Sequence, residues 1–87
     1  MKTLRLTNLS VACVDDQDWE RLSGFNWCEK RRSDGVTSYA FRYVRTDEKR
    51  YERRMLHHEI LGVSSGIRVD HRDGDGLNNA RSNLRIA

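Results

Sequence analysis

The segment from Val69 to Arg85 restricts the fold of this 87-residue chain more than any other part of it. It places a carboxylate beside an imidazole, Asp70 and His71, directly before the turn-forming sequence Asp73-Gly74-Asp75-Gly76. Aspartate and glycine at this density favour a tight turn, because both accept left-handed backbone angles. A carboxylate can bind a divalent cation and an imidazole can accept a proton from water. These are two requirements of metal-assisted phosphodiester hydrolysis.

Two simpler interpretations of this loop have to be weighed. A calcium loop of the EF-hand type would need an Asp in place of His71 and a Glu in place of Ser82, so calcium binding is disfavoured. An ordinary hairpin turn explains Asp73-Gly74-Asp75-Gly76 when that sequence is taken alone. The adjacent Asp70-His71 pair and the later Asn79 favour a functional site instead.

The segment resembles the HNH (ββα-metal) endonucleases, in particular small phage-type and homing-type members. Their pattern is roughly D-H-x-[ND]-G-[ND]-x-x-[ND]-N-x-x-x-N-L-R. The upstream residues 56–62, LHHEILG, resemble the M-H-R-x-I-L-G that precedes this pattern in the family. Val14-Asp15-Asp16 and Phe25-Asn26-Trp27-Cys28 look like the leader of the same group, so the resemblance covers nearly the whole chain. It implies a DNA-cutting protein encoded by a phage or mobile element and located in the bacterial cytoplasm.

The resemblance also implies roles for individual residues. His71 would be the general base that takes a proton from the attacking water, and Asp70 would coordinate a single Mg²⁺ or Mn²⁺ ion, since such ions prefer oxygen ligands. Asn79 would brace the loop and orient the histidine, and Asn83 would be structural. His57 matches a histidine that family members keep, although packing or capping at the start of a short helix is the simpler role for it.

The chain departs from the family pattern at its end. Family members continue past N-L-R into a helix whose Asn or His completes the metal shell, whereas the sequence here ends at Ile86-Ala87. Three functions are therefore considered. The first is an HNH endonuclease, the second a non-catalytic DNA-binding module, and the third a regulatory or inhibitory protein that binds another protein. A homodimer is also plausible, because an unfinished ββα unit leaves an apolar face and sheet edges open.

Positive charge is concentrated in the middle of the chain. Residues 30–54 contain nine basic and four acidic side chains, a net charge of +5, within a whole-chain net charge of +3. Arginine outnumbers lysine by 13 to 3, and its planar fork suits phosphate oxygens. DNA is therefore the expected partner, with a solvated β surface as the alternative. The arginines predicted to contact DNA are Arg31, Arg32, Arg42, Arg45, Arg50, Arg53, Arg54 and Arg72.

The hydrophobic pattern predicts an α+β fold. We expect short strands at 3–6 and 10–14, a helix at 15–23, a three-stranded antiparallel sheet within 25–55 packed by that helix, a second short helix at 56–61, and a hairpin of 68–71 with 83–86. Residues 1–55 would form a DNA-binding-like region and residues 56–87 the HNH-type hairpin region, within one compact unit. The hairpin would represent the two β-elements of an incomplete ββα-metal motif.

The clearest expected strand, at 37–45, alternates aromatic and other residues. Tyr39, Phe41 and Tyr43 fall on one face, where they either pack in the core or stack on nucleic-acid bases; core packing is the simpler assignment, as it is for Trp27.

The composition also excludes several classes of protein. No segment reaches the roughly 18 apolar residues of a membrane span, and the N-terminus has no signal-peptide pattern, so we expect a soluble, cytoplasmic protein without a membrane partner. Cys13 and Cys28 lack C-x-x-C spacing, which makes a zinc site or a disulfide unexpected.

Overall fold

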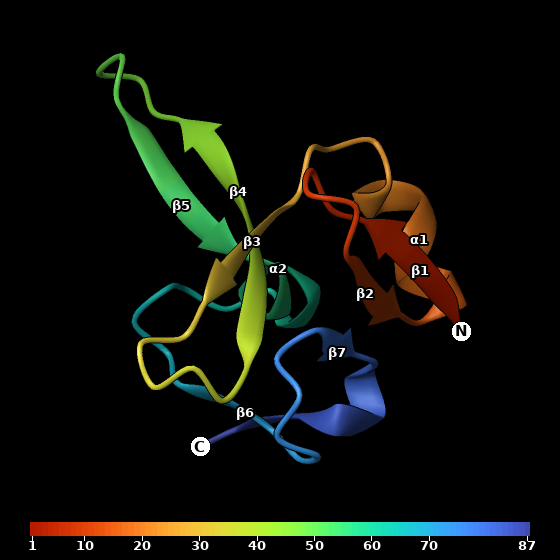
Figure 1. Ribbon diagram of the computed structural model, residues 1–87. Coiled ribbons are helices and arrows are strands. Elements are labelled where there is room, and N and C mark those ends of the chain that lie inside the picture. The colour runs from red at the N-terminus through yellow and green to blue at the C-terminus, as the bar shows by residue number, and fades with distance from the viewer.

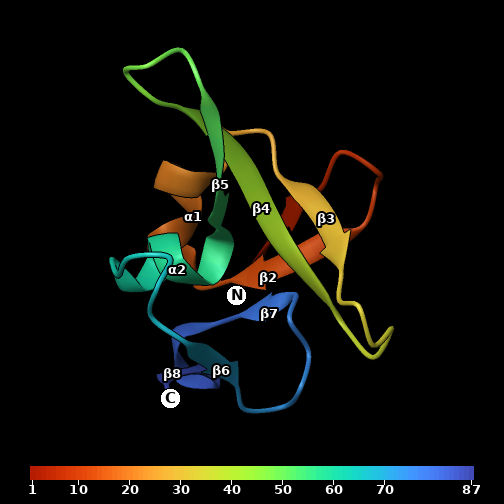
Figure 2. The ribbon, with the colours of Figure 1, turned by 90° about the vertical axis from the view of Figure 1, so that its left-hand side faces the viewer.

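The computed structural model describes residues 1–87 and contains three small sheets and two α-helices (Figures 1 and 2). In chain order the elements are β1 (Lys2–Arg5), β2 (Val11–Val14), α1 (Asp16–Leu22), β3 (Cys28–Arg31), β4 (Ser38–Arg45), β5 (Tyr51–Met55), α2 (Leu56–Leu61), β6 (Val69–His71), β7 (Asn78–Asn79), a 3-10 helix (Arg81–Asn83) and β8 (Leu84–Ile86). The predicted α+β class and most predicted elements are thus confirmed, with bounds shifted by one to three residues.

The first sheet joins the two ends of the chain. β1 and β2 form the expected antiparallel hairpin, and β7 adds to β2 in parallel, with Cys13 opposite Asn78 and Val14 opposite Asn79. The short strand β7 was not predicted from the sequence. Because it pairs with β2, the N-terminal region and the C-terminal hairpin region share one sheet and fold as one unit (Figure 1).

The second sheet is the expected three-stranded antiparallel one, in the order β3-β4-β5. β3 pairs with β4 only from Ser38 to Phe41, whereas the pairing of β4 with β5 extends from Phe41 to Arg45. The outer half of β4 therefore forms a two-stranded ribbon with β5, and this ribbon projects from the body of the protein (Figures 1 and 2).

The helix that packs on this sheet is not the predicted one. We expected the helix at 15–23 to cover the β3-β4-β5 sheet, but α1 lies against β1 and its Trp19 side chain donates a hydrogen bond to the Thr3 carbonyl at 3.0 Å. The short helix α2 contacts β4 and β5 instead. The chain passes from Met55 directly into Leu56 without a linker, which keeps α2 beside the sheet that it follows.

The core contains side chains from both ends of the sequence. Its ten buried members are Leu4, Leu6, Ala12, Val14, Leu22, Trp27, Ala40, Leu56, Ile60 and Leu84. A partly buried ion pair ties the same ends together, because the buried Asp18 carboxylate in α1 accepts bonds of 2.8 and 2.9 Å from the guanidinium of the more exposed Arg81. Arg81, and secondarily Arg21, holds the pKa of Asp18 below its ordinary value despite its burial.

The helices and the two cysteines bear on the expectations about membrane spans and disulfides. Neither helix is of the length and apolar character that a membrane crossing requires. Cys13 and Cys28 are free thiols and both are partly buried.

Candidate active-site cleft

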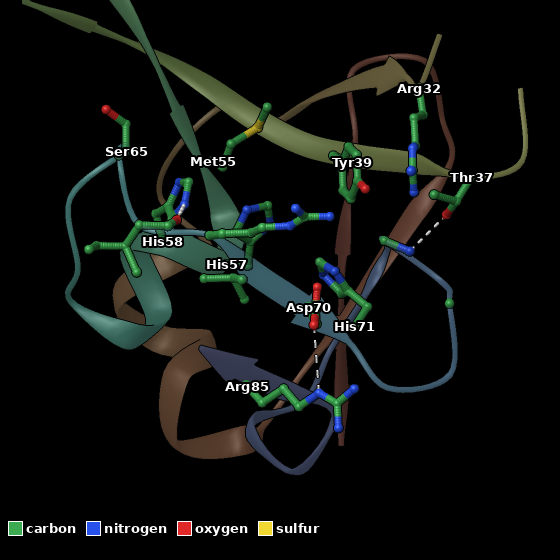
Figure 3. Close-up of a pocket in the computed structure, with 16 residues that line it drawn as sticks. Arg32, Thr37, Tyr39, Met55, His57, His58, Ser65, Asp70, His71 and Arg85 are labelled. Atoms are coloured by element: carbon green, nitrogen blue, oxygen red, sulfur yellow. Dashed lines mark hydrogen bonds and ion pairs between the residues drawn. The ribbon is translucent and has the colours of Figure 1, made fainter. Parts of the chain in front are cut away.

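A cleft of about 560 Å³ lies between β4, the start of α2, the loop before β6, and β6 itself (Figure 3). It brings together three residues singled out in the sequence, His57, Asp70 and His71. The same cleft is also lined by Tyr39, Met55, His58, Arg68 and Arg85. The cleft is therefore built from segments separated by more than 40 positions in the chain.

The orientation of His71 is determined by Asn79. His71 lies at the end of β6, and its Nε2 atom is 3.1 Å from Asn79 Oδ1. Because an amide oxygen only accepts hydrogen bonds, Nε2 carries the proton and Nδ1 keeps the lone pair. Asn79 is fully buried, and its own amide group donates to the Gly76 carbonyl at 3.3 Å, which keeps the acceptor in place. The geometry thus leaves His71 Nδ1 as the basic atom of the ring.

Asp70 precedes His71 in β6 and lies opposite Arg85 of β8. Its carboxylate is 3.8 Å from Arg85 Nε, and its side chain keeps 39% of its surface exposed, so this ion pair is loose. No group of three or more His, Cys, Asp or Glu side chains is arranged to hold a metal ion. Asp70 is the only carboxylate that lines the cleft, and it offers an oxygen of the type that Mg²⁺ prefers. The side chains present therefore make a partial fit to a metal ion, with one ligand.

His57 lies at the centre of a cluster of rings and is buried, as is His58. Its ring centroid is 5.1 Å from that of His71, 4.4 Å from that of His58 and 5.7 Å from that of Tyr39. Burial, with the neighbouring His58 and His71 as smaller causes, lowers the pKa of His57 from 6.5 to about 3. Its Nδ1 atom is buried without a hydrogen-bond partner. His57 thus supplies a neutral ring against one side of His71.

His58 has a structural bond of its own. Its Nε2–H donates to the Ile67 carbonyl at 2.7 Å and so holds the loop that precedes β6. Both histidines of α2 are buried and contribute to packing. His57 in addition touches the ring that the resemblance marks as catalytic.

The Asp-Gly loop after His71 is held by its own side chains. The Asp73 carboxylate accepts bonds from the amide groups of Asn78 and Asn83 at 2.8 and 2.9 Å and from the Asp75 backbone at 2.9 Å. These bonds, that from Asn78 first, hold the pKa of Asp73 below its ordinary value. Asn83 closes the loop further, because its Oδ1 atom accepts from the Asp73 backbone at 3.0 Å. The loop is thus a braced turn, and Asn83 has the structural position expected for it.

Gly76 is the point at which this loop meets β4. A Cβ atom at this position would collide with the Ser38 carbonyl and lie 2.5 Å from the Tyr39 ring. The Gly76 backbone also donates to Thr37 Oγ1 at 2.8 Å. The glycine therefore allows the close approach that places Tyr39 over His71, with ring centroids 5.7 Å apart.

The arginines predicted to contact DNA lie in different surroundings. Arg42 is already bound, because its guanidinium donates to both carboxylate oxygens of Glu59 at 2.7 and 2.9 Å and stacks over Phe25 at 3.8 Å. Arg32 pairs with Asp34 at 2.9 Å and also lines the cleft. The remaining predicted arginines are exposed, Arg31 at the end of β3, Arg45, Arg50, Arg53 and Arg54 on or beside the ribbon, and Arg72 just after β6.

Two cationic residues and one aromatic residue of the cleft were not assigned to it from the sequence. Arg68 and Arg85 line the cleft beside Asp70, and Tyr39 contacts both His57 and His71. Arg85 lies opposite Asp70 in the β6-β8 pair. This pairing could not be predicted from the sequence, because the register of two strands depends on the length of the loop between them. Tyr39 reaches the cleft through the Gly76 contact, for which the sequence contains no local signal.

Comparison with known proteins identified no matching family model, no curated protein and no solved structure.

Proposed function

We propose that this chain is an HNH-type metal-dependent DNA endonuclease that hydrolyses phosphodiester bonds by nicking or cutting DNA. One observation carries the proposal, the hydrogen bond between His71 Nε2 and the buried Asn79. It leaves Nδ1 as the unprotonated nitrogen of His71, a residue that lines the cleft together with Asp70 and the arginines Arg32, Arg68 and Arg85. A base, a carboxylate and cationic groups in one cleft are the parts that phosphodiester hydrolysis uses.

In this mechanism His71 Nδ1 accepts a proton from a water molecule whose oxygen bonds to the scissile phosphorus. The P–O bond to one sugar oxygen breaks, and that oxygen takes a proton from solvent. Asn79 keeps the ring in the required tautomer, and the neutral His57 ring packs beside it without adding a competing charge. Arg68 and Arg85 place positive charge at the rim, where phosphate oxygens would lie. A single Mg²⁺ or Mn²⁺ held by Asp70 would stabilise negative charge that develops on the phosphate.

A second candidate is favoured by the partial metal site. Because Asp70 is the only carboxylate in the cleft, a non-catalytic DNA-binding protein, or a regulatory protein that binds another protein, would also agree with the arrangement. The DNA-binding alternative predicts salt-sensitive binding without cleavage, since each neutralised phosphate adds to the salt dependence. The regulatory alternative predicts a protein partner and little affinity for DNA.

The deciding experiment is nicking of supercoiled plasmid with Mg²⁺ or Mn²⁺, beside EDTA and the His71→Ala variant. Nicking that requires the metal and is lost in His71→Ala, with an unchanged circular dichroism spectrum, supports the endonuclease. Nicking at the wild-type rate in His71→Ala would remove this residue from the mechanism. Retardation of DNA on a low-salt gel without any nicking would support the binding protein, and no retardation would favour a protein partner.

A further inference from the structure

The outer half of the β4-β5 hairpin is a free two-stranded ribbon. Beyond the Phe41–Met55 pair, β4 has no neighbour other than β5, and the two strands continue to the Arg45–Tyr51 pair and the turn at 46–50 (Figure 1). The backbone of this ribbon projects from the protein body in the two views of the fold (Figures 1 and 2), although Arg42 at its base packs against Glu59 and Phe25. A two-stranded ribbon of this kind fits the major groove of B-form DNA.

One face of the ribbon combines aromatic rings with guanidinium groups. Tyr43 lies opposite Arg53 and Arg45 lies opposite Tyr51, so each tyrosine on this face has an arginine as its cross-strand neighbour. The Tyr43 ring is 5.3 Å from the Phe41 ring, and the Arg53 guanidinium lies over the Phe41 ring at 5.2 Å from its centroid. Tyr43, Phe41 and Arg53 are therefore on one face of the ribbon.

The tyrosines of this face are largely exposed, although Tyr43 packs edge-on against the Phe41 ring. Tyr43 is 54% exposed and Tyr51 is 66% exposed, although both are large rings. Exposed tyrosine and arginine together supply hydroxyl donors, forked donors and flat surfaces, which can contact phosphates and base edges. The face is therefore suited to a nucleic acid, which presents both phosphates and base edges.

The opposite face is less suited to DNA. Its Arg42 is bound to Glu59, and the next pair along the ribbon places the Glu52 carboxylate opposite Val44. Among the paired residues of this face, Arg54 is the only cation without an ion-pair partner. Arg50 lies beside the turn. The two faces of one ribbon thus differ in chemistry while carrying similar numbers of arginines.

The tyrosine-arginine face is also continuous with the cleft. Tyr39, Phe41, Tyr43 and Arg45 alternate along β4, and side chains two positions apart point to the same side of a strand. Tyr39 lines the cleft beside His71, as does Met55, the partner of Phe41 (Figure 3). A duplex with one phosphate at His71 would meet this face of the ribbon next.

We propose that the face formed by Tyr43, Arg45, Tyr51 and Arg53 enters the major groove of duplex DNA and sets the position of the duplex relative to the cleft. The proposal rests on the proposed function for its ligand, DNA, but does not require cleavage. Arg42, although predicted from the sequence to contact DNA, is not part of this surface.

The test compares two double variants of equal charge. Arg45→Ala/Arg53→Ala removes two cations from the tyrosine-arginine face, and Arg50→Ala/Arg54→Ala removes two from the other side. Binding of the full chain to a labelled mixed-sequence DNA duplex is followed by fluorescence anisotropy over a range of salt concentrations. We expect the first variant to bind about tenfold more weakly than the second and to have the smaller salt slope. Equal losses would overturn the proposal, because they would reflect net charge alone.

The groove is tested with competitors and with other nucleic acids. We expect methyl green, a major-groove ligand, to displace the protein, and netropsin, a minor-groove ligand, to leave it bound. An RNA duplex of the same sequence should bind more weakly, because its major groove is deep and narrow. Displacement by netropsin alone, or tighter binding of the single strand, would overturn the assignment to the major groove.

The same variants separate this proposal from the nuclease. Face-dependent binding without any plasmid nicking would support the ribbon surface while rejecting the endonuclease. Wild-type nicking by Arg45→Ala/Arg53→Ala, with duplex affinity unchanged, would reject the ribbon surface while leaving the endonuclease in place.

Discussion

The His71 imidazole and the Asn79 amide, eight positions apart, are joined at 3.1 Å across the loop that the chain makes between β6 and β7. Asn79 is completely buried and paired through its backbone with Val14 of β2. The ring that the proposed mechanism uses is thereby anchored to the first sheet of the protein. Changes at Asn79 are therefore expected to act on the tautomer of His71 as well as on the packing of the first sheet.

We expect Asn79→Ala to lower the nicking rate about 10- to 100-fold, because it removes the acceptor that holds the Nε2 proton. Long-range ¹H–¹⁵N correlation spectra of the imidazole should show the Nε2–H tautomer of His71 in the wild type and a tautomer mixture in the variant. Asn79→Asp keeps an acceptor oxygen at this position and should therefore retain the Nε2–H tautomer of His71. An unchanged tautomer in Asn79→Ala would contradict this role.

The lowered pKa of His57 predicts a dependence of stability on pH. The unfolded chain binds a proton at His57 below about pH 6.5, whereas the folded chain does so only near pH 3. The free energy of unfolding should therefore rise with pH between these values, by up to about 1.4 kcal/mol per pH unit, and His57 should add no slope above pH 6.5. Urea unfolding between pH 5 and 7.5, where most carboxylates stay ionised, measures the slope. It should be smaller in His57→Gln, and equal slopes would contradict the assignment.

The Arg42–Glu59 pair predicts a stability effect rather than an effect on DNA affinity. Both side chains are only 15% exposed, and the pair joins β4 to α2. Arg42→Ala should lower the free energy of unfolding by about 2–3 kcal/mol, since it leaves a largely buried carboxylate unpaired. Arg54→Ala, at the facing position of β5, removes an exposed arginine and should change the value by less than about 0.5 kcal/mol. Equal effects in chemical denaturation would show that the pair is not stabilising.

The contact at Gly76 predicts a position that tolerates no side chain. Gly76→Ala should lower the free energy of unfolding by about 2–3 kcal/mol, because the added Cβ atom collides with the Ser38 backbone. It should also shift the NMR resonances of Tyr39 and His71. Gly24→Ala is the matched control, since no atom lies within 4 Å of its added Cβ, and it should change the value by less than about 1 kcal/mol. Wild-type stability of Gly76→Ala would contradict the close approach.

The parts of the fold that the sequence predicted are those that depend on neighbouring residues. The strand at 38–45 follows from alternation, and the short helix has the bounds predicted for it, Leu56 to Leu61. In each case the physical cause acts over a few residues, so it can be read from the chain alone.

The candidate site was predicted in part for the same reason. Asp70 and His71 are adjacent in sequence, and the loop that follows them closes on its own side chains, so their proximity is local. The presence of His57 against His71, of Tyr39 over both, and of Arg85 opposite Asp70 depended on tertiary contacts. The sequence indicated a reactive pair, but not the walls of the cleft around it.

The sequence by itself therefore determined the α+β class, the positions of most elements and the Asp-His pair with its braced turn. Only the tertiary structure decided that β7 joins β2, that α2 rather than α1 covers the β3-β4-β5 sheet, and that Arg42 pairs with Glu59. These contacts bring together segments that are far apart in the chain. They are stabilised by burial and by pairing between distant groups, which the preferences of neighbouring residues do not predict. Which arginines remain exposed on the ribbon follows from the same packing.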